Sequence, residues 1–222
     1  MKHLFLFILN VVLMQQIQGQ TTFEGYVIYK NEIQNPNPKI MSDSIYKEKL
    51  KLAFGGKTYL LQKYFYKGSN YKSEMTMGNI ITQQLYSPSD FKLYTWMSNK
   101  DDATYLSTKE SEDTIKEIKK IEGEEEILGI KCKKLSIVGT KSTVTYWYNS
   151  KYYMLRYEDY KTHQYGFWNE YLKQTGAMPL KFEYKTTNAH IITTATEVKN
   201  IKLKDSEFTL PKFKSISEIK MK

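Results

Sequence analysis

Several residue types are nearly absent from this chain, and each absence narrows what the protein can be. Cys132 is the only cysteine among 222 residues, so no internal disulfide can form and the fold depends on its core. We expect Cys132 to pack as a small apolar side chain, because a catalytic thiol would require a nearby base. Histidine occurs three times, without the spacing of a zinc site. We therefore predict no metal and no cofactor.

Arginine is also scarce. Arg156 is the only arginine among 33 basic residues, although the formal net charge is +9. Proteins that read nucleic acids favour arginine, whose planar group makes paired hydrogen bonds to bases and phosphates. We predict no nucleic-acid partner, and we interpret the lysines as a solvated face with, at most, a weak attraction to anionic lipid.

Long hydrophobic runs are limited to one segment near the start. Leu4 to Met14 is apolar except for Asn10, and it lies between the basic Met1–His3 region and the polar "QQIQGQ". The run is shorter than the roughly 20 residues that span a bilayer as a helix. This layout predicts a signal peptide over residues 1–20, cleaved near Gly19, and a periplasmic or secreted protein. The alternative is a buried N-terminal helix.

The expected mature chain, residues 21–222, has the length of one domain. We expect it to be a monomer with no transmembrane segment. No cysteine lies near the expected cleavage site, so we expect no lipid anchor on a mature N-terminal cysteine.

What the chain does contain favours strands. It has 19 tyrosines and 10 phenylalanines, which suit the half-buried surface of a sheet. Alternating segments between turn residues predict strands at 23–30, 57–66, 71–77, 80–86, 91–97, 103–110, 130–138, 143–149, 152–158, 180–187 and 190–203. The segment 111–126 is ambiguous, and we favour a strand followed by a polar turn at "EGEEE".

Two short helices are expected among these strands. Ser42 can cap a helix over 43–54, with Ile45 and Leu52 on its apolar face and two glycines at its end. A second helix is expected within 163–176, ending at Gly176. About ten strands with short turns predict a mainly β protein: one strongly curved antiparallel sheet, a half-open barrel, covered by the helices.

One stretch shows the expected two faces clearly. In "GAMPLKFEY", which begins at Gly176, the glycine and proline turn the chain back after the second helix. Leu180, Phe182 and Tyr184 then alternate with Lys181 and Glu183. We predict that the first three face the interior and that the lysine and glutamate face solvent.

The order of several motifs resembles a known family. "FEGYVIYK", "EEEILGIKCKKLSIV", "TVTYWYN", "GAMPLKFEY" and "KLKDSEFTLP" follow one another as in a secreted gram-negative domain family of unknown function, related to the LolA-like lipoprotein carriers. The resemblance covers roughly 23–211 and implies a half-open barrel whose concave face is apolar and holds acyl chains. The features with which the carriers pass lipoproteins to membrane partners have no counterpart here that we can place.

Residues at alternate strand positions supply such a face. The candidate cavity lining is Met75, Met77, Phe91, Leu93, Met97, Leu180, Phe182 and Tyr184. Methionine adapts to varied apolar ligands, whereas packing against the helices as an ordinary core is the competing interpretation.

No catalytic signature accompanies this pattern. The chain shows no phosphate loop, nucleophile elbow or serine–histidine–acid order. Glu158 and Asp159 are adjacent and would point to opposite faces of a strand. We therefore predict a non-enzymatic binding or carrier protein for an apolar small molecule or lipid. The alternatives are a cell-envelope module that binds a protein partner, with a filled core, and an unrecognised hydrolase.

Overall fold

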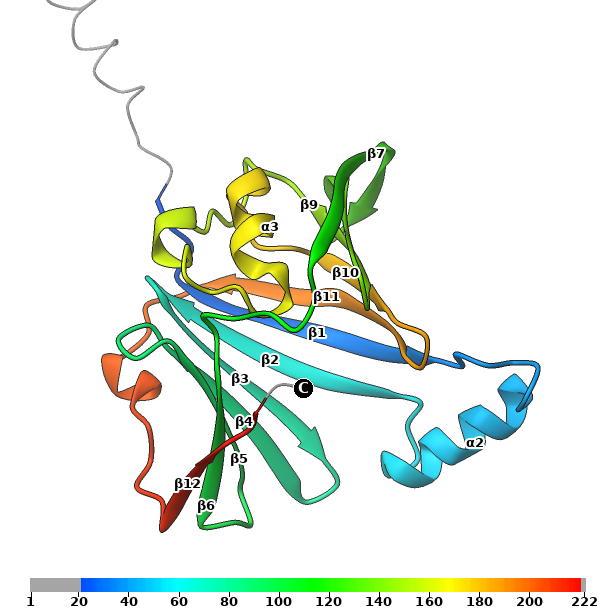
Figure 1. The fold of residues 1–222 in the computed structure, drawn as a ribbon, viewed down its shortest axis with the longest axis horizontal. Coiled ribbons are helices and arrows are strands. Elements are labelled where there is room, and N and C mark those ends of the chain that lie inside the picture. Colours follow the sequence, from blue (N-terminus) through cyan, green and yellow to red (C-terminus); the bar gives the residue numbers. More distant parts are fainter. Residues whose placement is uncertain (1–20, 221–222) are drawn as a thin grey trace, which may run out of the picture.

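The computed structural model describes residues 21–220 as one large open sheet with two short α-helices (Figure 1). The predicted signal peptide, residues 1–20, lies outside the described residues. The strands are β1 (Gly25–Gln34), β2 (Tyr59–Lys67), β3 (Asn70–Met77), β4 (Ile80–Ser87), β5 (Lys92–Met97), β6 (Asp102–Ser107), β7 (Ile115–Ile127), β8 (Ile130–Gly139), β9 (Thr143–Tyr148), β10 (Lys181–Lys185), β11 (His190–Asn200) and β12 (Ser215–Glu218).

The strands form a single sheet in the order β12-β6-β5-β4-β3-β2-β1-β11-β10-β9-β8-β7. Every neighbouring pair is antiparallel except β12 and β6, which run parallel. β1 lies between β2 and β11, so the first strand of the described chain pairs with a late one in the middle of the sheet. The mainly β, antiparallel, open architecture predicted from the sequence is confirmed, with two strands more than the expected ten or so.

Two segments differ from the prediction. "EGEEE" is part of β7 and not a turn: the strand continues through it with an irregularity between Ile121 and Glu125, where Gly123 takes a positive φ of 84°. The segment 152–158 is not a strand. It makes only one isolated bridge, Met154 to Ala177, and then the short 3₁₀ helix η1 (Tyr157–Asp159). Of this segment only Leu155 is fully buried, whereas Tyr152 is 48% exposed.

The first helix, α2 (Asp43–Ala53), begins where its cap predicts. The Ser42 hydroxyl accepts a hydrogen bond from the Ile45 amide at 3.4 Å. The predicted apolar face was wrong, however, because Ile45 is 55% exposed and Leu52 is 86% exposed. Figure 1 shows α2 beyond the ends of β1 and β2, away from the faces of the sheet, so this helix does not cover the sheet.

The second helix, α3 (Trp168–Thr175), does cover the sheet. It follows the 3₁₀ helix η2 (Tyr165–Phe167), and the ring of Tyr171 stacks on Tyr146 of β9 with 4.1 Å between ring centroids. Gly176 ends α3 with a φ of 61°, and its amide donates to the Leu172 carbonyl at 2.8 Å. Leu180 is then 1% exposed in the main core. The helix–glycine–strand order of this stretch is confirmed.

The solvent-facing half of that stretch needs a correction. Lys181 was expected to face water, but its side chain is only 19% exposed. Its ammonium group lies 2.7 Å from Glu125 and 4.5 Å from the ring centre of Trp147. Trp147 lies on the neighbouring strand β9 and Glu125 lies on β7, and strand periodicity alone does not reveal such partners.

A second, smaller core lies on the face of β4–β6 that points away from the main core. Leu85, Tyr94, Trp96 and Ala103 are buried there, and Phe208, Leu210 and Phe213 pack against them. These last three belong to the C-terminal segment, which contains the short 3₁₀ helix η3 (Asp205–Phe208) and β12. Because both sides of the sheet are needed to bury the aromatic residues, the C-terminal segment closes the outer side of this end.

Candidate functional site

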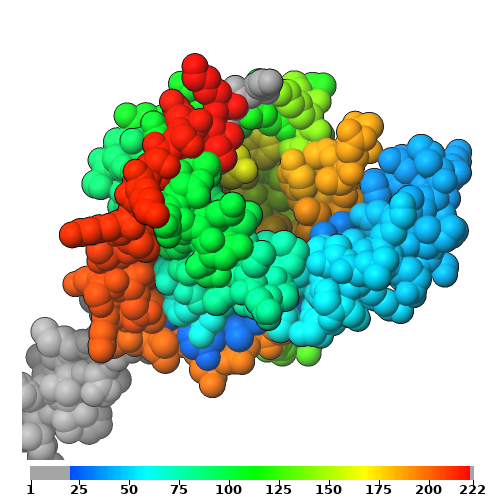
Figure 2. All heavy atoms as spheres, turned by 90° about the horizontal axis from the view of Figure 1, so that it is seen from below, coloured from blue at the N-terminus to red at the C-terminus, as the bar shows by residue number. Residues whose placement is uncertain are grey.

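The concave face of the sheet encloses a cavity of about 540 Å³. This volume lies within the range of small-molecule sites. Figure 2 shows the corresponding hollow from below, with residues near 190 (orange) and near 110 (green) at its edge. Ten of its 24 lining residues are aromatic: Tyr29, Tyr64, Tyr66, Tyr71, Tyr146, Tyr165, Phe167, Trp168, Phe182 and Tyr184.

The innermost tyrosines turn their rings toward the cavity and use their hydroxyls elsewhere. Tyr29 donates to the Pro179 carbonyl at 2.6 Å, and Tyr146 donates to the Gly166 carbonyl at 3.1 Å. Burial raises the pKa of the Tyr29 and Tyr146 hydroxyls well above the ordinary value, so both stay neutral. This inner part of the cavity wall is therefore uncharged ring surface of the kind that contacts apolar ligands.

A buried histidine fixes the segment between β9 and β10 against this wall. His163 is 2% exposed, and its Nε2 lies 2.8 Å from the Tyr71 hydroxyl. Burial, which penalises the charged imidazolium, lowers the His163 pKa to about 4. His163 is therefore neutral at physiological pH and adds no charge to the cavity.

One edge of the cavity is built around the Asp113 carboxylate. It accepts hydrogen bonds from the Ser142 hydroxyl (2.7 Å), the Lys141 amide (2.8 Å) and the Thr140 hydroxyl (2.7 Å). Burial alone would raise the Asp113 pKa, but these donors outweigh it and the pKa lies below its ordinary value. Gly139 leaves room for the carboxylate, since a Cβ there would lie 2.4 Å from an Asp113 oxygen. These hydrogen bonds connect the loop before β7 to the β8–β9 turn.

Three of the eight predicted lining residues contact the cavity: Leu93, Phe182 and Tyr184. The Phe182 ring packs edge-on against Tyr29, with 5.8 Å between centroids. Tyr184 is 36% exposed, so it lies at the mouth and not in the interior. Whether any of these residues binds a ligand stays a prediction.

The other five residues lie elsewhere. Leu180 packs in the core. By strand register, Met75 and Met97 lie two positions beyond Ser73 and Thr95 on the same face, and Met77 lies further out, so all three continue the concave face past the cavity. Phe91 occupies a turn with φ 58°, with Lys109 4.4 Å from its ring centre.

Strand alternation could not indicate the part of the lining that lies outside the strands. Tyr165, Phe167 and Trp168 come from the segment between β9 and β10, and Glu112 and Asp113 come from the loop before β7. The cluster of aromatic residues before Gly176 was the only sequence signal for this segment, and it indicated a helix and not a cavity wall.

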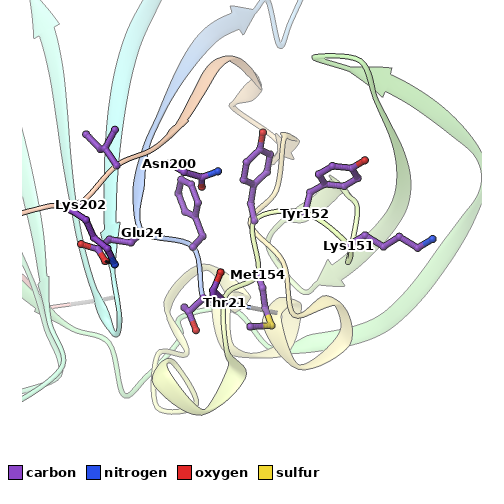
Figure 3. A pocket seen from close by; sticks show the side chains of 11 residues that line it. Thr21, Glu24, Lys151, Tyr152, Met154, Asn200 and Lys202 are labelled. Carbon is purple, nitrogen blue, oxygen red and sulfur yellow. Dashed lines mark hydrogen bonds and ion pairs between the residues drawn. The ribbon is translucent and has the colours of Figure 1, made fainter. Parts of the chain in front are cut away.

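A larger depression, about 1020 Å³, lies outside the sheet near the start of the described chain (Figure 3). It is bounded by Thr21–Glu24, Lys151–Met154 and Asn200–Lys202. Two of its charged groups already pair with each other, since Lys202 lies 2.9 Å from Glu24, which also accepts the Leu203 amide at 2.8 Å. Without convergent groups directed at a ligand, this depression is a weaker candidate than the aromatic cavity.

Two further observations concern the described residues alone. Within residues 21–220 no helix is long and apolar enough to cross a membrane. The same residues contain no group of three or more His, Cys, Asp or Glu side chains placed to hold a metal ion.

Comparisons with known proteins give a fold and no family. No protein-family model matches the chain, and no curated protein matches its sequence. Among solved structures, an uncharacterized conserved protein from Thermus thermophilus is 8% identical with a TM-score of 0.50, covering 95% of this chain and 99% of that one. This likeness extends over both chains and shows a shared fold.

Two other solved structures are more distant. PNGF-II, in its P21 crystal form, is 15% identical with a TM-score of 0.46, and the match covers 89% of this chain but 31% of PNGF-II. This chain thus spans about a third of that protein. LprF from Mycobacterium bovis is 10% identical with a TM-score of 0.34, covering 82% of this chain and 88% of LprF. Membership of the carrier-related family stays a prediction.

Proposed function

We propose that this protein is a non-enzymatic binding protein that holds an apolar or amphipathic ligand, such as a lipid or acyl chain, on the concave face of its sheet. The observation that carries the proposal is the cavity of about 540 Å³, whose wall is aromatic and whose inner tyrosine hydroxyls bond to the protein itself. Contact with such rings removes apolar ligand surface from water, at about 25 cal/mol per Å².

The state of the titratable groups agrees with binding as the role. His163 is neutral and tied to Tyr71, and burial raises the Cys132 pKa to about 11, so its thiol stays protonated. Neither group is poised near neutral pH, where a general base or a thiolate nucleophile works.

The alternative role, an envelope module that binds a protein partner along a sheet edge, has less support. β7 is an edge strand with an exposed, charged sequence, and it carries irregularities at two places. Charges and bulges on an edge strand are the usual means of preventing pairing with another strand.

Native mass spectrometry tests the binding role most directly. The full-length precursor is expressed in a gram-negative host, and the protein is purified from the periplasm and analysed intact, followed by lipid extraction. We expect a non-covalent adduct that organic solvent releases. A protein that carries no adduct and also fails to bind a fluorescent apolar probe, N-phenyl-1-naphthylamine, would refute the proposal.

A pair of variants places the ligand. Phe182→Trp adds volume inside the cavity and should weaken probe binding at least fivefold. Lys185→Gln, on the same strand with a side chain 50% exposed, should leave probe binding unchanged. Equal effects of the two substitutions would place the probe elsewhere.

The compartment belongs to the same proposal. The apolar run from Leu4 to Met14 supports export, and N-terminal sequencing of the purified protein should give a start close to Gln20. Recovery of intact Met1 in the cytoplasmic fraction would contradict export.

A further inference from the structure

A row of polar, uncharged side chains crosses the otherwise aromatic concave face. Its members stand on six neighbouring strands, from β11 through β1 to β5: Thr193, Asn31, Gln62, Ser73, Gln84 and Thr95. Ser73 lies directly opposite Gln84, and Gln84 directly opposite Thr95, so the row follows the register of the sheet. An acyl-chain site built only for apolar contact would not require these groups, because burying them has a cost.

Hydrogen bonds link the row from end to end. The Thr193 hydroxyl donates to Asn31 Oδ1 at 2.7 Å, and Asn31 Nδ2 donates to Gln62 Oε1 at 3.4 Å. Gln62 Nε2 donates to the Ser73 hydroxyl at 3.1 Å and also to the Tyr64 hydroxyl at 3.1 Å.

The remaining links continue to β5. The Ser73 hydroxyl donates to Gln84 Oε1 at 3.4 Å, and Gln84 Nε2 donates to Thr95 Oγ1 at 3.3 Å. The row thereby holds its amide groups in fixed orientations.

Two of the amides keep hydrogen-bonding capacity. A side-chain amide has two N–H donors. Gln62 uses both, whereas Asn31 and Gln84 each use one within the described part of the chain. Asn31 and Gln84 are also two of the residues that line the cavity. The cavity therefore presents neutral donors in the middle of an apolar wall, and these donors suit an acceptor such as a carbonyl oxygen.

The charges around the cavity oppose an anion. The charged lining residues are Glu112, Asp113 and Lys141, which sum to one negative charge. The Lys141 ammonium lies 3.8 Å from Glu112, so the lysine already has a carboxylate partner. A ligand carboxylate in this cavity would lose its hydration and meet a net negative surrounding.

We propose that the cavity selects an uncharged acyl ester or acyl amide over a free fatty acid, with the Gln84 amide donating to the ligand carbonyl. This selection rests on the proposed binding function. The rings of Tyr29, Tyr146 and Phe182 take the acyl chain, and the polar row sets the depth at which the carbonyl comes to rest.

Competition against N-phenyl-1-naphthylamine tests the selection. The purified mature chain is titrated at pH 8 with dodecanoyl monoglyceride or with dodecanoate, which share one chain and differ in charge. Both are kept below their aggregation concentrations. We expect the monoglyceride to displace the probe at a concentration at least tenfold lower than dodecanoate.

Variants test whether the row of polar side chains causes this selection. Gln84→Met preserves the length of the side chain and removes its donors, and it should reduce the preference for the monoglyceride about tenfold, with each displacement corrected for the probe affinity of the same variant. Gln83→Met is the matched control, because Gln83 precedes it on β4, points to the opposite face and does not line the cavity. Asp113→Asn removes the negative charge and should strengthen dodecanoate binding several-fold.

The outcomes distinguish a failure of the ligand selection from a failure of the binding function. If dodecanoate displaces the probe as well as the monoglyceride does, or if Gln84→Met and Gln83→Met behave alike, the selection is refuted while the binding function stands. If the protein binds neither the probe nor either lipid, the binding function fails, and the selection fails with it.

Discussion

Acidification should destabilise this protein through one residue, His163. Its side chain is 2% exposed, and burial lowers its pKa from 6.5 to about 4. The unfolded chain therefore binds a proton at a higher pH than the folded protein does. The stability that comes from a neutral His163 is fully present above pH 6.5 and is lost as the pH falls toward 4.

The magnitude follows from the two pKa values. Linkage between an ordinary pKa of 6.5 and a folded-state pKa of about 4 gives a loss of about 2 kcal/mol in unfolding free energy between pH 7 and pH 5. Over this window ordinary carboxylates, with pKa values near 4, stay mostly ionised. The window thus isolates the histidine from general acid denaturation.

The assay is urea denaturation followed by tryptophan fluorescence at pH 7, 6 and 5. His163→Gln is the comparison protein, because its amide can still bond to the Tyr71 hydroxyl but does not titrate. His190 is present in both proteins and cancels. We expect the wild type to lose about 2 kcal/mol more than the variant over this range. Parallel losses in the two proteins would refute the assignment of a buried, neutral His163.

Three further predictions concern the core and the cavity edge. Phe182→Ala should lower the unfolding free energy by about 2 kcal/mol. This is less than the roughly 3–5 kcal/mol expected for a fully buried phenylalanine, because the ring is half-buried and lines the cavity. Urea melts that show no change would mean that its ring contacts are not formed in solution. Cys132→Ala should cost about 1 kcal/mol, and the wild-type thiol should not react with Ellman's reagent at pH 8 in the folded state, since it is buried and its pKa is raised to about 11; rapid reaction before unfolding would disprove this. Gly139→Ala should lower the unfolding free energy by roughly 1–3 kcal/mol, because the new methyl group displaces the Asp113 carboxylate. In thermal melts the double variant Gly139→Ala/Asp113→Ala should recover part of that loss. Additive losses would argue against the contact.

Local patterns in the sequence determined much of the architecture. Alternation and turn residues were sufficient for most strands, because side chains on a strand alternate between two faces whatever the strand pairs with. The cap at Ser42 and the glycine at Gly176 marked the beginning of α2 and the end of α3 for the same local reason. The fate of Cys132 as a buried thiol also followed from its type and its neighbours.

Only the tertiary structure decided which of these elements form the cavity. Strand order is a property of distant pairings, so the position of β1 between β2 and β11 was not readable from either segment. Helical periodicity predicted an apolar face on α2, but Ile45 and Leu52 stay exposed, because α2 lies beyond the ends of β1 and β2, away from the faces of the sheet. The polar row likewise consists of single residues far apart in the chain. It becomes a feature only when six strands align, because the pairings of β1 with β11 and with β2, which place Asn31 between Thr193 and Gln62, depend on segments distant in the chain.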